Sequence, residues 1–194
     1  MGFSIRARAF LIRTHHQYSM RILLTGSTGM IGSHLLEKLK KKHTIIEFSL
    51  RNGMDITKKE DCEKAVKNMD IIIHAAAELD ETKGAQHMWE TNFTGTKNLL
   101  EAAEKNTITQ FIFLSSVGVY GEPRDTIHEE SEKNPHTNYE RSKKEAEDAV
   151  WSYQEVFPVT IIRPAIVIGP NGYWSKIFKI VQKGFPLIGN GKNT

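Results

Sequence analysis

The sequence has 194 residues, 39% hydrophobic and 25% charged, which is close to the average of globular domains and excludes wholesale disorder. The net charge of +3 is too small to indicate a nucleic-acid partner. A single cysteine, Cys62, excludes an internal disulfide and a Cys/His zinc site. Since no apolar run reaches the roughly 18 residues of a membrane span, we expect a cytoplasmic protein that binds neither membrane nor nucleic acid.

The first 19 residues differ in composition from the rest of the chain. They contain three arginines, and no acidic residue occurs before Glu37. Such a composition is found in organelle transit peptides. Alternatively the stretch precedes the true start, because Met20 stands directly before the first predicted strand. We favour the second interpretation and expect an extension, disordered or mis-started, over 1–19 and a single domain over 20–194.

Short apolar runs alternate along the chain with segments whose apolar residues recur at three- and four-residue spacing. Such runs predict buried parallel strands, and such spacing predicts helices. In chain order we expect a strand at 21–25, a helix at 30–42, a strand at 44–50, a helix from a capping box of Thr57 and Glu60 to about 68, a strand at 71–77, a helix at 86–105, a strand at 110–115, a helix at 138–156, a strand at 159–163 and a helix at 174–183. The alternation predicts an α/β fold, a doubly wound parallel sheet of the Rossmann type.

A loop with glycine at every third position joins the first predicted strand to the first helix. Gly26 permits a tight turn, Gly29 lets the backbone approach a pyrophosphate, and Gly32 allows the helix to pack closely on the strand. Backbone N–H groups at the helix start then bind the anion. A glycine-rich turn without a ligand is the alternative, but the strand–turn–helix context favours a dinucleotide. The residues predicted to line this cofactor site are Gly26, Ser27, Thr28, Gly29, Met30, Ile31 and Gly32.

Tyr139 and Lys143 stand four residues apart on a predicted helix, so they share one face. A phenol with a pKa of about 10 is a poor base near neutrality, but a neighbouring ammonium favours the phenolate. The pair therefore predicts an acid/base for hydride chemistry, an incidental surface pair being the alternative. The fourth predicted strand ends at Ser115 and Ser116. A hydroxyl there faces the crevice where parallel sheets bind ligands and can hydrogen-bond a reacting oxygen.

The string TGSTGMIGSHL, the Tyr139–Lys143 spacing and the segment from Ser115 to Gly121 resemble the extended branch of the short-chain dehydrogenase/reductase superfamily. The resemblance runs from Met20 to the end of the chain. It implies an NAD(P)-dependent enzyme of the epimerase/dehydratase group. The catalytic residues that it implies are Ser116, Tyr139 and Lys143. Beyond the glycine loop and Arg51, the cofactor-binding residues that it implies are Asp55, Ile56, Ala75, Ala76, Ala77, Asn92, Ser115, Tyr139, Lys143 and Pro164.

Two of these assignments have an alternative. The three alanines would line the cofactor ribose, but they are equally well explained as ordinary core residues. Asn92 is expected to fix the active-site backbone by hydrogen bonds, and the alternative is an exposed helix amide. We expect no metal site, because neither His74 nor the pair His15–His16 has a second ligand at zinc spacing.

The end of the second predicted strand bears on the choice of cofactor. NAD-preferring members of the family carry an aspartate there, which binds the ribose 2′-hydroxyl. In this chain Ser49 occupies the position and Arg51 follows two residues later. Without the carboxylate a 2′-phosphate is not repelled, and Arg51 can pair with it. We therefore predict a slight preference for NADP(H) over NAD(H).

The resemblance implies a small-molecule substrate and hydride transfer at a secondary alcohol or ketone, a nucleotide sugar being one candidate. Val117 and Gly118 stand where 4,6-dehydratases carry Asp-Glu, and Leu79 stands where several sugar epimerases carry a lysine. A hydroxysteroid- or flavonol-type carbonyl reductase and a non-catalytic NAD(P)-binding fragment are the alternatives.

Two further expectations follow from the resemblance. Because extended members continue beyond the point where this sequence stops, we expect the substrate lobe to be largely missing. The two long helices, at 86–105 and 138–156, imply a homodimer, with Trp89 and Trp151 as anchors. The alternative is that both tryptophans belong to the core.

Overall fold

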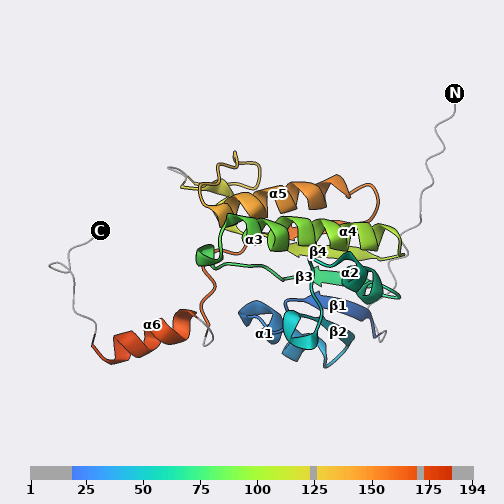
Figure 1. Cartoon of the computed structure of the whole chain (residues 1–194), viewed down its shortest axis with the longest axis horizontal. Coiled ribbons are helices and arrows are strands. Elements are labelled where there is room, and N and C mark those ends of the chain that lie inside the picture. Colours follow the sequence, from blue (N-terminus) through green and yellow to red (C-terminus); the bar gives the residue numbers. More distant parts are fainter. Residues whose placement is uncertain (1–18, 123–125, 170–172, 185–194) are drawn as a thin grey trace.

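The computed structural model describes residues 19–122, 126–169 and 173–184. The predicted N-terminal extension therefore lies, apart from Ser19, outside the described residues. One parallel sheet is ordered β2-β1-β3-β4-β5 (Figure 1). Its strands are β1 Arg21–Thr25, β2 Thr44–Phe48, β3 Ile71–His74, β4 Gln110–Leu114 and β5 Val159–Ile162.

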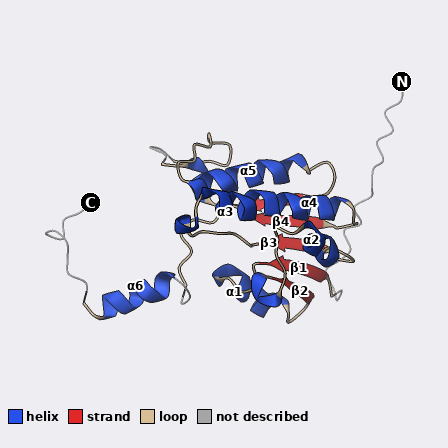
Figure 2. Cartoon of the chain, in the orientation of Figure 1, coloured by secondary structure: helices blue, strands red, loops and turns tan. Residues whose placement is uncertain are grey.

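Helices cover both faces of this sheet (Figure 2). Along each strand, side chains alternate between the two faces. Ile22 and Leu24 therefore point to the face covered by α1 (Met30–Leu39). Leu23, between them, points to the opposite face, which forms the larger core. The predicted doubly wound α/β fold is confirmed.

Three helices build the larger core. They are α2 (Lys59–Ala65), α4 (Gly95–Glu104) and α5 (Asn138–Ser152), with α4 and α5 side by side in Figure 1. Phe111 and Phe113 of β4 are fully buried beneath them. This packing fixes α5 over β4 and β5, with Lys143 at the carboxyl end of β4.

The long helix predicted at 86–105 contains a wide turn. It consists of α3 (Ala85–Trp89), a π-helical turn η3 (Glu90–Thr94) and α4. A π turn shifts the side chains that follow it out of the regular helical period, and such turns frequently occur at functional sites. Asn92 lies in this turn and is buried.

The predicted capping box at Thr57 and Glu60 is wrong. The carboxylate of Asp55 accepts hydrogen bonds from the backbone N–H and the hydroxyl of Thr57, and α2 begins only at Lys59. The aspartate side chain has closed a local turn that competes with the helix start.

Two strands are shorter than predicted. The second ends at Phe48 instead of residue 50, because Leu50–Asn52 form a 3-10 turn, η1. The third ends at His74 instead of residue 77, since the N–H of Ala76 donates to the hydroxyl of Thr25 and leaves the ladder.

The last described helix, α6 (Tyr173–Gln182), extends away from the sheet (Figure 1). Phe178, Ile180 and Val181 on it are exposed. Within the described part of the chain, no helix combines the length and the apolar character needed to cross a membrane.

Candidate active site

The β1–α1 loop is closed by glycines that no other residue can replace without a backbone shift. Gly26 has a φ of +66°, and a Cβ there would lie 2.8 Å from the carbonyl oxygen of Ala75. A Cβ on Gly32 would lie 2.0 Å from the carbonyl oxygen of Gly26. The loop is therefore pressed between the end of β3 and the start of α1.

The amino end of α1 has the features of an anion site. Gly29 is its N-cap and no side chain caps it, so its first N–H groups have no partner within the helix. A Cβ on Gly29 would meet only the Gly26 oxygen, at 3.2 Å, with open space otherwise. Beside it the buried Oγ atoms of Ser27 and Ser49 have no hydrogen-bond partner among the described residues. Buried polar atoms of this kind are rare in proteins, and phosphate and ribose oxygens of a dinucleotide would satisfy them.

Next to this loop, His74 at the end of β3 is held by a chain of hydrogen bonds. Thr25 donates its hydroxyl to Nδ1 (2.7 Å), because Nδ1 of the neutral ring carries no proton when Nε2 does, and the Thr25 oxygen accepts the N–H of Ala76. Nε2–H donates to the oxygen of Thr96 (2.9 Å), whose hydroxyl donates to the carbonyl of Asn92 (2.6 Å). Burial, with a smaller effect of the Lys143 charge, lowers the pKa of His74 to about 3. The imidazole is therefore neutral and links β1 and β3 to the π turn.

Asn92 connects the loop after β3 to α5. Its amide oxygen accepts from the N–H of Glu78 (2.7 Å), while its amide nitrogen donates to the Glu78 carbonyl and to the Ser142 hydroxyl, both at 2.9 Å. Ser142 in turn donates to the carbonyl of Tyr139 (2.7 Å). Asn92 is thus a buried amide that fixes the backbone; a direct contact between Asn92 and a cofactor stays a prediction.

The start of α5 is fixed from two sides. Thr137 and Glu140 form a capping box, each side chain accepting the backbone N–H of the other. The carboxylate of Glu81, from the loop after β3, accepts the N–H of Tyr139 at 2.9 Å. Sequence reasoning missed Glu81, because the two residues are 58 positions apart.

Tyr139 meets Ser116 at the carboxyl edge of the sheet. Ser116 begins the 3-10 turn η4 (Val117–Tyr120), where its Oγ accepts the N–H of Gly118 at 3.1 Å. Burial raises the pKa of the Tyr139 phenol, and a hydrogen-bonding interaction with Ser116 opposes this shift. The raised pKa is opposite in direction to the one that the Tyr139–Lys143 spacing predicted.

The pKa of Tyr139 is raised instead of lowered because of where Lys143 lies. Its side chain is buried, with Nζ donating to the carbonyl of Leu114 at 2.5 Å and lying 4.1 Å from the centre of the Phe113 ring. Burial lowers the pKa of Lys143 to about 7, opposed by the charge of Glu147. In this arrangement the ammonium binds the end of β4, and burial decides the phenol pKa of Tyr139.

The predicted site residues fall into two groups. The glycine loop, the three alanines, Ser115, Ser116 and the Tyr139–Lys143 pair follow neighbouring parallel strands or lie on α5 and share one edge of the sheet. Pro164 lies there too, its carbonyl accepting the N–H of Val117 at 3.1 Å.

The second group follows β2, at the side of the sheet. Arg51 is exposed on η1, the carboxylate of Asp55 is engaged by Thr57, and the side chain of Ile56 packs in the core against α4 at Gly95. Cofactor contacts by these residues stay predictions.

Comparison with known proteins supports this description. The family model described as "NAD dependent epimerase/dehydratase family" matches residues 22–192. A UDP-glucose 4-epimerase of Vibrio cholerae is 33% identical over 193 residues, a match that covers 86% of this chain and 58% of the relative.

Two solved structures are also similar. The UDP-glucuronic acid 4-epimerase of Bacillus cereus in complex with NAD has a TM-score of 0.77 at 26% identity, over 87% of this chain and 64% of that one. RMD from Pseudomonas aeruginosa complexed with NADPH has a TM-score of 0.69 at 28% identity, over 78% and 56%. The chain spans less than two thirds of the length of each of these three proteins. It belongs to the NAD-dependent epimerase/dehydratase family, within the extended short-chain dehydrogenase/reductase superfamily.

Proposed function

We propose that the chain carries the cofactor-binding and hydride-transfer part of an NAD(P)-dependent oxidoreductase that acts on a secondary alcohol or ketone. The observation that carries the proposal is the meeting of Ser116, Tyr139 and Lys143 at the sheet edge that also bears the glycine loop. A nucleotide sugar is the favoured substrate class, because the similar proteins are named for UDP-sugars.

The residues present fit a dinucleotide. The free N–H groups at the start of α1 would hold its pyrophosphate, and the unpartnered hydroxyls of Ser27 and Ser49 would hydrogen-bond its oxygens. A bound nicotinamide supplies the hydride acceptor or donor and, when oxidised, a positive ring close to the site.

The chain's own residues would handle the proton. Since its pKa is raised, Tyr139 keeps its proton at neutral pH and is suited to donate it to the oxygen of a substrate carbonyl. Ser116, next to it, would hydrogen-bond that same oxygen. In the oxidising direction Tyr139 must release its proton. In this structure the Lys143 ammonium is bonded to the Leu114 carbonyl and burial sets the phenol pKa, so we propose that the charge of Lys143 assists this release once cofactor and substrate are bound.

Replacing Tyr139 by Phe tests the proton-transfer role. The 194-residue chain is expected to turn over slowly, because it spans 58% of the epimerase relative and substrate positioning contributes roughly 7–11 kcal/mol in favourable cases. Reduction of bound NAD⁺ by a UDP-hexose, followed by NADH fluorescence, is therefore measured in the chain and in a fusion with the C-terminal part of that relative. We expect faster reduction in the fusion and loss of it in Tyr139→Phe, with NADH affinity nearly unchanged. Reduction at an equal rate in Tyr139→Phe would contradict the assignment.

We also propose that NADP(H) is bound in preference to NAD(H). Ser49 at the end of β2 brings no carboxylate to repel a 2′-phosphate, and Arg51 is exposed two residues further on and forms no ion pair with any described residue. A charge-assisted hydrogen bond to the phosphate is worth about 1.5–3 kcal/mol.

Titration calorimetry with NADPH and NADH measures this preference. Arg51→Ala should weaken NADPH binding by about 10- to 150-fold and leave NADH binding unchanged. Lys41→Ala, an exposed cation after α1, is the control and should change neither affinity. Tighter binding of NADH than NADPH by the unmutated chain would overturn the preference.

A homodimer through the helices on the larger-core face belongs to the same proposal, as does a cytoplasmic location, which imaging of a tagged chain tests.

A further inference from the structure

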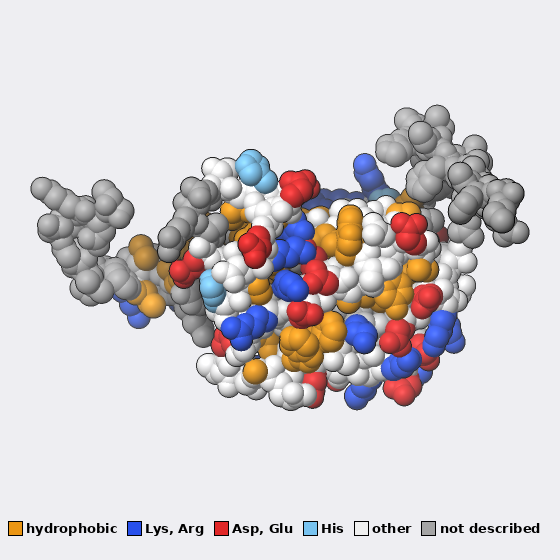
Figure 3. Space-filling view, turned by 90° about the horizontal axis from the view of Figure 1, so that it is seen from above, with side chains coloured by type: hydrophobic (Ala, Val, Ile, Leu, Met, Phe, Trp, Pro, Cys, Tyr) orange, Lys and Arg blue, Asp and Glu red, His pale blue; other side chains and the backbone are white. Residues whose placement is uncertain are grey.

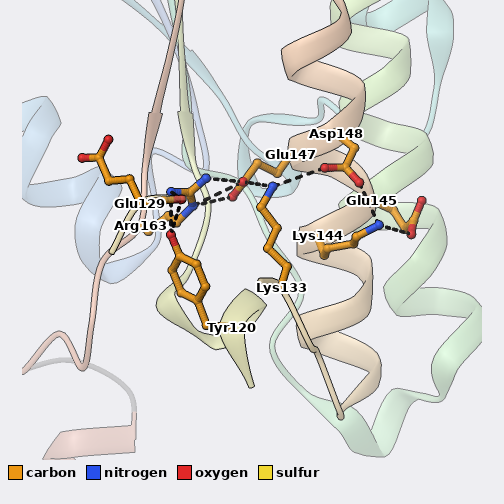
Figure 4. Close-up of polar contacts among 8 residues, drawn as sticks. All are labelled: Tyr120, Glu129, Lys133, Lys144, Glu145, Glu147, Asp148 and Arg163. Carbon is orange, nitrogen blue, oxygen red and sulfur yellow. Dashed lines mark hydrogen bonds and ion pairs between the residues drawn. The ribbon is translucent and has the colours of Figure 1, made fainter. Parts of the chain in front are cut away.

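Glu147 is a buried carboxylate on α5 (Figure 4). It lies four residues, one helical turn, beyond Lys143. Its side chain is 1% exposed. Arg163, which follows β5, contacts it through Nη2 at 2.5 Å and Nε at 3.0 Å, and Lys133 from the preceding loop contacts it at 2.5 Å. The Ser115 hydroxyl makes no well-formed hydrogen bond there, yet lies close enough to help lower the pKa of this carboxyl.

The cations around Glu147 are themselves held in place. Arg163 donates to the hydroxyl of Tyr120 at 2.8 Å and lies over its ring, and Tyr120 donates to the carbonyl of Glu129 at 3.0 Å. Burying a charge costs several kcal/mol unless partners compensate it. Replacing such a charged cluster as a whole by apolar residues is often neutral or stabilising, so attachment of α5 to β5 does not by itself require a buried carboxylate here.

The residue on which Glu147 can act is Lys143, one turn earlier on α5. Tyr139, Lys143 and Glu147 are spaced by four residues and therefore share one face of the helix. His74 and Tyr139 are the titratable groups that face Lys143 from β3 and α5, and neither is an anion at neutral pH. Among the described residues, Glu147 is the carboxylate whose charge supports the protonated form of Lys143.

We propose that Glu147 is a positioning residue, clamped by Arg163 and Lys133, whose negative charge favours the protonated form of the buried Lys143 and its bond to the end of β4. Its value for hydride transfer rests on the proposed function, in which Lys143 supplies positive charge to Tyr139. Its effect on Lys143 itself does not depend on cofactor or substrate. A solely structural Glu147 would hold α5 to β5 without changing the titration of Lys143.

The test follows Lys143 directly. The 194-residue chain is labelled with ¹³Cε-lysine, the Lys143 signal is identified by its loss in Lys143→Arg, and its chemical shift is followed against pH. Burial already lowers the pKa of Lys143 to about 7. In Glu147→Gln the midpoint should fall further, by about one pH unit. Glu145→Gln is the matched control: Glu145 pairs with Lys144 on the outer side of α5 and should leave the midpoint unchanged (Figure 4).

A second variant covers the case in which Glu147→Gln does not fold. Arg163→Gln leaves Glu147 paired with Lys133 and removes a neighbouring positive charge, so the Lys143 midpoint should rise. An unchanged midpoint in whichever of these variants folds would overturn the proposal. Binding of NADPH and of NADH is measured alongside by fluorescence: a wild-type chain that binds neither would contradict the proposed function, while the Lys143 titration still decides the role of Glu147.

Discussion

The burial of Lys143 lowers the stability of the folded chain. Its pKa is lowered to about 7 in the folded chain by burial, from an ordinary value of 10.5. Between these two pH values the unfolded state binds the proton more readily than the folded state does. The free energy of unfolding contributed by this group therefore rises with pH across that window and is least below pH 7.

Replacing Lys143 by Met removes this penalty. We expect the variant to melt at a higher temperature than wild type at pH 6.5, and the advantage to shrink as pH rises towards 9.5. Thermal unfolding followed by circular dichroism at the two pH values measures it. An advantage that grows with pH would show that Lys143 is not buried as described.

The residues proposed as catalytic, and the backbone-fixing role of Asn92, were predictable from the sequence and its resemblance, whereas the partners that hold them in place were not. Tyr139 and Lys143 are four positions apart, so the regular period of a helix is enough to place them on the same face. The partners of Asn92 lie on a loop 14 residues earlier and on Ser142, 50 residues later. Glu147 likewise forms its ion pair with Arg163, which lies on another element, after β5. Such pairs are set by how elements pack, which the pattern of one sequence does not encode.

Elements were predicted in type and order because strands of a parallel sheet read as apolar runs and helices as three- and four-residue periods. Their ends were predicted wrongly where a side chain accepts a backbone N–H. The carboxylate of Asp55 does so before α2, and the hydroxyl of Thr25 does so after β3. The π turn within α3–α4 adds one residue to a helical turn and has no signature in the period. These ends and turns are the places where the site is built.

The helices on the larger-core face also carry the prediction of a dimer. Trp89 and Trp151 are 38% and 54% exposed, so the alternative that both belong to the core is wrong. Trp89 packs on Phe93 with ring centres 4.8 Å apart. Exposed aromatic side chains at an interface centre contribute strongly to association.

Light scattering at rising protein concentration tests the pairing. We expect a dimer mass for the unmutated chain and a monomer mass for Trp151→Glu. Leu50→Glu, at a 75% exposed position on η1, should leave the dimer intact. A monomer at high concentration in the unmutated chain would contradict the pairing.

At the scale of the whole molecule, the described residues form one parallel sheet flanked by helices, and the face drawn in Figure 3 carries apolar side chains interspersed with charges of both signs. The carboxyl edge of the sheet gathers the glycine loop, Ser116 and the α5 face into one region, while α6 stands apart with its apolar side chains exposed. We propose that this edge binds a nicotinamide dinucleotide, and the hydride-transfer roles proposed for Ser116, Tyr139 and Lys143 depend on that binding.

Titration calorimetry with NADPH on the chain and on Gly29→Val tests that claim most directly. A valine at the N-cap of α1 places its side chain in the space through which the pyrophosphate reaches the helix N–H groups. Glu37→Val, which adds the same side chain at an exposed position of α1, is the control, and circular dichroism shows whether each variant is folded. We predict NADPH binding by the unmutated chain and by Glu37→Val, and none by a folded Gly29→Val. Equal binding by a folded Gly29→Val would contradict the account.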